Sequence, residues 1–120
     1  MEQESILLSI KKALSLPEEI EDFDPEIIMY INGNLAYLTE LGVGPPGGFK
    51  ITGEKETWDE LIKDDRFNDV KTLIYLRVRM IFDPPTVTVL EKAFTEQLRE
   101  LEWRIHEKRE EDQWTPPPKF

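Results

Sequence analysis

Apolar residues recur along this chain every three or four positions, in segments that prolines and glycines separate. Such spacing gathers the apolar side chains on one face of a helix. The pattern predicts helices over residues 5–14, 25–41, 57–62, 70–82 and about 87–111. Strand-like alternation is nearly absent. The sequence therefore predicts an all-α fold, a small bundle of four to five helices with a long C-terminal helix.

Capping residues and helix breakers agree with these boundaries. Ser5 is a candidate N-cap, and Asp24 followed by Pro25 suits an N-cap with proline at the first helical position. Gly42 is placed to end the second helix. Asp83-Pro84-Pro85 stops the fourth helix and turns the chain into the last one, which would be about 37 Å long.

The segment 42–56 is rich in glycine and proline and is predicted to be a loop. A loop of this length without secondary structure of its own is often functional. Its sequence GPPGG does not fit a phosphate-binding loop, because Phe49 and Ile51 flank Lys50 where that motif requires other residues. The candidate contact residues of the loop are Gly44, Pro45, Pro46, Gly47, Gly48, Phe49 and Lys50.

The 120 residues are enough for one domain, and we assign 1–111 to a helical domain and 112–120 to an extended proline-rich tail. The chain has no cysteine, which excludes disulfides, zinc–thiolate sites and a cysteine nucleophile. No apolar run approaches the roughly 20 residues of a membrane span, so no membrane contact is expected.

Negative charge is concentrated in the first half of the chain. The net charge is −10, and residues 1–62 carry 13 acidic and 4 basic side chains. Binding to nucleic acid by charge requires clustered lysine and arginine. The composition therefore argues against a nucleic-acid-wrapping protein, and it suits either simple solubility or a surface that DNA passes without adhering.

The sequence holds no recognisable catalytic or metal site. Its single histidine, His106, lies beside Glu102 and Glu110 on a polar helix end, and further ligands are not evident. We therefore expect no enzyme activity and no cofactor.

Two features favour contact with other proteins. Arg77 and Arg79 lie within an apolar helix and need acidic partners, either in the same chain (Glu91 or Glu96) or in another subunit. The tail carries two aromatic residues on a proline-rich strip, a composition typical of a docking segment, although an incidental terminus is the alternative. The tail residues concerned are Trp114, Pro116, Pro117, Pro118 and Phe120.

The succession of SILLSIKKAL, FDPEIIMYIN, TWDELI, VKTLIYLRVRMIFDPP and LEWRI resembles the small head–tail connector (adaptor) proteins of long-tailed phages and prophages of Gram-positive bacteria. The resemblance spans about residues 5–105. It implies a structural virion protein, made in the host cytoplasm, that forms a ring, usually of twelve copies, beneath the portal protein at the neck of the particle. Such a ring extends the DNA channel without binding DNA specifically, and it carries the next connector, stopper or tail protein.

With this resemblance, the tail is expected to bind the portal, and residues 44–50 to face the channel lumen or the next ring. Arg77 and Arg79 are candidates for contacts between neighbouring copies. A free cytoplasmic helical regulator that binds another protein is the alternative function. The residues expected in or near the core are Leu73, Ile74, Leu98, Leu101 and Trp103.

Overall fold

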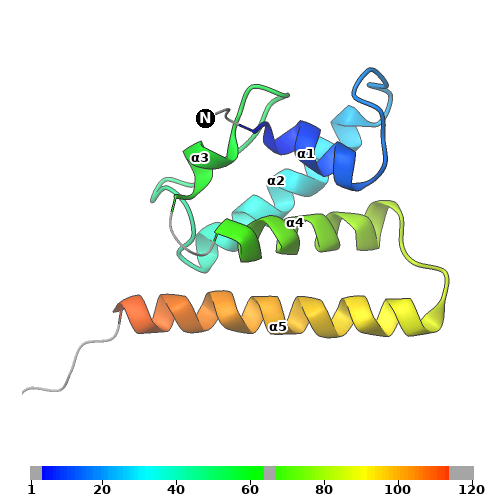
Figure 1. Cartoon of the computed structure of the whole chain (residues 1–120). Coiled ribbons are helices and arrows are strands. Elements are labelled where there is room, and N and C mark those ends of the chain that lie inside the picture. Colours follow the sequence, from blue (N-terminus) through cyan, green and yellow to red (C-terminus); the bar gives the residue numbers. More distant parts are fainter. Residues whose placement is uncertain (1–3, 64–66, 114–120) are drawn as a thin grey trace, which may run out of the picture.

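The computed structural model describes residues 4–63 and 67–113, with side chains described for 4–63 and 68–107. Within these ranges the chain forms five helices and no strand, which confirms the all-α prediction. Figure 1 shows α5 lying antiparallel to α4, with α2 crossing on the other side of α4 and with α1 and α3 farthest from α5. The helices are α1 (Ile6–Ala13), α2 (Asp24–Glu40), α3 (Trp58–Leu61), α4 (Phe67–Phe82) and α5 (Thr88–Gln113).

Most predicted helix ends agree with the structure to within two residues, but α4 begins at Phe67, three residues before its predicted start, and one predicted cap is wrong. The Ser5 hydroxyl accepts a hydrogen bond from the Leu8 amide at 3.2 Å, and Gly42 adopts a positive φ of 79° after α2. Asp24, however, does not cap α2: the helix already includes it, and Phe23 occupies the N-cap position. The Asp24 carboxylate instead lies 2.9 Å from the Lys11 ammonium. The side chain that the sequence assigned to capping therefore forms an ion pair.

The core is built mainly from α1, α2 and α4. Their inward faces contribute fully buried aliphatic side chains, and Leu73 and Ile74 are among them, as predicted. Trp58 of α3 closes the core at one end, and its indole N–H donates to the Ser9 hydroxyl of α1 at 2.7 Å. Backbone hydrogen bonds from Ile6 to Glu56 and from Trp58 to Glu4 fasten the start of α3 to the start of α1. Residues distant in sequence thus seal one end of the bundle.

A buried lysine holds the connection between α1 and α2. Lys11 is only 1% exposed, and besides the Asp24 carboxylate its ammonium donates to the carbonyls of Glu18 and Ile20 at 3.0 and 2.8 Å. The acidic connector therefore folds back over α1. Three oxygen acceptors compensate for removing this charge from water.

α5 is attached along one stripe only. The sequence spacing places Leu90, Phe94, Leu98, Leu101 and Ile105 on this stripe. Leu101 and Ile105 are buried, and Phe94 and Leu98 pack partly buried against the core, which confirms these four positions, whereas Leu90 is 47% exposed. Trp103 was predicted to lie in or near the core, and this was wrong: its side chain is 61% exposed. Two residues correspond to about 200° of rotation on a helix, so a side chain between Leu101 and Ile105 must point away from α4.

Candidate functional site

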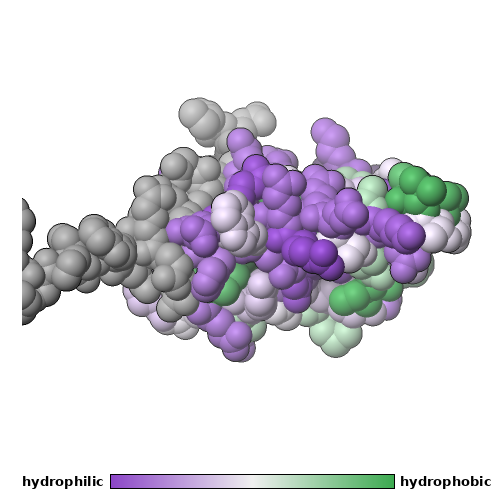
Figure 2. Space-filling model, turned by 90° about the horizontal axis from the view of Figure 1, so that it is seen from below, coloured by the Kyte–Doolittle hydropathy of each residue, from purple (hydrophilic) through white to green (hydrophobic). Residues whose placement is uncertain are grey.

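An exposed apolar surface lies at the turn between α4 and α5. We define the corner surface as four aliphatic side chains that lie close together in sequence and are each 47–74% exposed. They are Ile81, Val87, Val89 and Leu90. Figure 2 shows hydrophobic residues gathered at this end of the molecule, while the rest of the α5 face is mostly hydrophilic. Contiguous exposed apolar groups rimmed by polar residues mark sites of protein contact.

The corner surface continues toward the connector between α1 and α2. Phe82 at the end of α4 contacts Phe23 edge to face, with ring centroids 5.4 Å apart. Phe23 and Ile20 are each 42% exposed. The sequence analysis missed this surface. The signal that could have found it is that Val87 and Val89 lie outside the 94–98–101–105 stripe that α5 buries.

The loop 42–56 is held against the bundle at several points. Val43 and Ile51 are buried, and Phe49 packs against the core. The Asn32 side chain of α2 accepts from the Ile51 amide at 2.8 Å and donates to the Ile51 carbonyl at 2.9 Å. A side-chain amide thus pairs with the loop backbone as a neighbouring strand would, and this fastens the loop to α2.

Glu56 closes the end of this loop. Its carboxylate accepts hydrogen bonds from the Thr52 amide and hydroxyl at 3.1 and 2.8 Å. Burial acts to raise the pKa of Glu56, but these hydrogen bonds favour the ionised form more strongly, and the pKa is lowered overall. Glu56 therefore holds the turn as a carboxylate at neutral pH.

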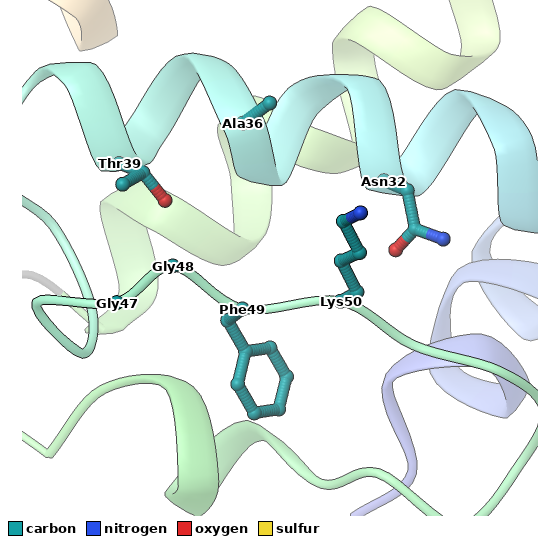
Figure 3. A pocket seen from close by; sticks show the side chains of 7 residues that line it. All are labelled: Asn32, Ala36, Thr39, Gly47, Gly48, Phe49 and Lys50. Carbon is teal, nitrogen blue, oxygen red and sulfur yellow. The ribbon is translucent and has the colours of Figure 1, made fainter.

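A shallow hollow of about 380 Å³ lies between the loop and α2. In Figure 3, Lys50 extends toward α2 beside Asn32, whereas Phe49 points to the opposite side of the loop backbone. The predicted loop residues Gly47, Gly48, Phe49 and Lys50 line this hollow together with Asn32, Ala36 and Thr39 of α2. The loop therefore brings one cationic side chain to an otherwise mostly neutral recess.

Replacing Gly44 by alanine is expected to destabilise the protein by about 1–2 kcal/mol, because φ is +90° there and a Cβ atom would lie 3.0 Å from Leu61 Cδ1. Urea unfolding measures the effect. Gly47→Ala is the matched control, since a Cβ at that position meets nothing within 4 Å. Equal stabilities of the two variants would contradict the strained conformation of Gly44.

Arg77 joins three helices within one chain. Its guanidinium donates to the Asn34 side chain of α2, lies 4.4 Å from the centre of the Tyr37 ring, and pairs with Glu102 of α5 at 3.1 Å. Burial, assisted by the charge of Glu102, raises the pKa of Tyr37. The acidic partner is thus Glu102, and not Glu91 or Glu96 as the sequence suggested. A contact of Arg77 with another copy stays a prediction.

Arg79 has a different environment on the other margin of α4. Its guanidinium donates to the Tyr75 hydroxyl at 3.0 Å and stacks on Phe94 of α5 at 4.8 Å. The Nε atom is buried and has no hydrogen-bond partner within the described part of the chain. Within that part, Arg79 is therefore held by an aromatic ring and a hydroxyl, without a carboxylate.

The remaining predictions concern the tail and bound ions. Trp114, Pro116, Pro117, Pro118 and Phe120 lie outside the described residues. Among residues 4–63 and 67–113, no group of three or more acidic, histidine or cysteine side chains could hold a metal ion. No helix in these ranges is long and apolar enough to span a membrane.

The described residues form a small helical protein with an exposed apolar corner surface. The chain belongs to the phage connector protein family, whose model matches residues 6–112 and therefore covers all five helices nearly completely. This match confirms the resemblance to head–tail connectors and supports a structural role among the virion proteins of a phage. No match was found among curated proteins or solved structures.

Proposed function

We propose that this protein is a head–tail connector that forms a ring beneath the portal protein, extends the DNA channel and carries the next connector, stopper or tail protein. The observation that carries the proposal is the family match over residues 6–112. The exposed corner surface supports it, because a protein of this size that acts alone has little use for four neighbouring exposed aliphatic side chains.

A ring requires two unlike lateral surfaces on each copy, because the contact around a circle is heterologous. The corner surface supplies an apolar patch at one end of the molecule, and the acidic residues of the first half supply charge elsewhere. Arg77 and Arg79 remain candidates at a boundary between copies, since the Arg77 side chain keeps 34% of its surface exposed beyond its internal partners. Twelve copies is the number that the family resemblance implies.

The tail and the loop have separate roles in this proposal. Residues 114–120 bind the portal through Trp114 and Phe120, and residues 44–50 face the channel lumen or the next ring. The net charge of −10 lets DNA pass without adhering. The protein would thus lie at the neck of the virion, and the proposal includes no catalytic step and no cofactor.

The proposal is tested by co-sedimentation of the full chain with DNA-filled, tailless capsids of the phage that encodes it. We expect binding at ring stoichiometry. Two further chains identify the surfaces: Val87→Ser with Val89→Ser at the corner, and Trp114→Ala with Phe120→Ala in the tail. Each should weaken binding at least about tenfold if it removes a central apolar contact.

Met29→Ser is the matched control, because Met29 is 61% exposed on α2, outside the residues that define the corner. Normal binding by one of the two variant chains would remove that surface from the proposed interface. Failure of the unmodified chain to bind would overturn the connector proposal and favour the free helical regulator. Charge reversal of Arg77 and Arg79 with unchanged ring assembly would exclude their contact between copies.

A further inference from the structure

The outer face of α5 presents a tryptophan that nothing in the described part of the chain covers. Trp103 is 61% exposed and lies on the side of the helix opposite Leu101 and Ile105. Three charged residues, Arg99, Glu100 and Glu107, lie one turn away on that face. A large aromatic side chain in such surroundings loses favourable burial unless another segment packs on it.

Trp103 borders one of two adjoining shallow hollows. The hollow beside it measures about 330 Å³ and is bounded by Glu96, Arg99, Glu100 and Trp103. The second measures about 290 Å³, shares Glu96 and Arg99 with the first, and continues toward Thr88. Together they form a shallow, elongated depression along the outer face of α5. The hollow beside Trp103 lies at the end of this depression that is nearer to Gln113.

We propose that residues 114–120 of the same chain fold back along α5 and cover Trp103. The length of the tail supports this occupant. Trp103 lies ten residues before Gln113, which is about 15 Å along the helix axis. If Trp114 and Thr115 reverse the chain direction, the five residues 116–120 in polyproline II conformation span about 16 Å. The end of the tail therefore reaches Trp103.

The composition of the tail matches the surface. By these lengths Phe120, at the end of the tail, is the apolar group that reaches Trp103. The prolines before it lose little entropy on binding, because proline-rich segments are already extended. Lys119 would lie near Glu100 and Glu107, which are exposed on α5; Glu100 also lies 3.7 Å from Arg104, so Lys119 shares that carboxylate.

The same lengths exclude the corner surface as a site for the tail of its own chain. The 26 residues of α5 span about 39 Å. Seven fully extended residues reach at most about 25 Å. Of the two exposed apolar surfaces on α5, only the one around Trp103 is within reach. This inference concerns the free chain and does not depend on the connector proposal.

The test uses the full chain labelled with 5-fluorotryptophan. Its three tryptophans give three fluorine resonances, and Trp103→Phe and Trp114→Phe chains assign two of them. In the variant with Pro116→Gly, Pro117→Gly and Pro118→Gly, we expect the Trp103 resonance to shift and to respond more strongly to exchange of H₂O for D₂O, because solvent reaches the ring. Lys119→Glu should cause a change in the same direction. The Trp58 resonance should stay in place.

All of these tail substitutions follow Gln113, the last residue of α5, in sequence, and circular dichroism of each variant checks that the helices are intact. Lys50→Glu serves as the control for a charge change elsewhere. A Trp103 resonance with the same position and the same isotope response in the unmodified and the triple-glycine chains would overturn the proposal. Measurements on diluted samples identify the source of the tail. Solvent protection that disappears on dilution would mean that the tail of a second copy covers Trp103, and the contact within one chain would be wrong.

Discussion

Replacing Trp58 by alanine is expected to lower the free energy of unfolding by about 4 kcal/mol, the largest effect of any single substitution considered. The side chain is 1% exposed, and its indole N–H donates to Ser9, whose own hydroxyl donates to the Ile6 carbonyl. The substitution leaves a cavity, removes the donor to a buried hydroxyl, and loosens α3 from α1. Chemical denaturation followed by circular dichroism measures it.

Two further chains separate these contributions. Trp58→Phe keeps most of the buried surface but loses the hydrogen bond to Ser9, and we expect a smaller loss of about 1–2 kcal/mol. Trp103→Ala removes the same kind of side chain from an exposed position and should change stability by no more than about 0.5 kcal/mol. A loss in Trp103→Ala comparable to that in Trp58→Ala would contradict the two burial assignments.

Replacing Lys11 by alanine is expected to lower the free energy of unfolding by about 3 kcal/mol. The substitution leaves the Asp24 carboxylate and two backbone carbonyls without their donor, and Asp24 is only 21% exposed. The connector between α1 and α2 should also become more accessible to proteases, since Lys11 holds it in place. Denaturation and limited proteolysis report the two effects separately.

Lys12→Ala is the matched control, because Lys12 is the adjacent residue of the same helix and is exposed. We expect its stability and its proteolysis pattern to match those of the unmodified protein. If Lys11→Ala and Lys12→Ala behaved alike, the buried ion pair would not be the element that holds the connector.

Much of the fold could be predicted because its helices are delimited locally. The 94–98–101–105 spacing, Gly42 and the Pro84-Pro85 break each act within one or two helical turns, and each is found where the sequence placed it. The short helix α3 was also predicted from local residues: the Glu60 side chain accepts from the Thr57 amide, as a capping box requires.

The errors have a common physical cause, which is the number of neighbours that an element has. Trp103 was assigned to the core because it is apolar and follows Leu101, but α5 packs along a single stripe and leaves its other side open. The spacing of the stripe already excluded residue 103, so this error was avoidable. The corner surface was missed for the same reason.

Contacts between distant segments could not be predicted from local patterns. The spacing places Lys11 one turn from Leu7 and Leu14 on the buried face of α1, but no local pattern shows that the connector folds over it. In the sequence, Asn32 is an ordinary polar helix residue. Its side-chain amide gains its partner only when the loop brings Ile51, 19 positions later, against it. The predicted roles of the tail, the loop tip and the two arginines in assembly stay predictions.

The Arg77 cluster has a mechanical consequence for α5. Aliphatic packing resists separation of two helices but tolerates sliding by a turn, because one aliphatic side chain can replace another. Hydrogen bonds are directional, and a guanidinium that joins Asn34 of α2 to Glu102 of α5 is satisfied at only one axial position. A pull along α5 is therefore transmitted to α2 through Arg77. The last helix can thus pass tension to the body of the protein.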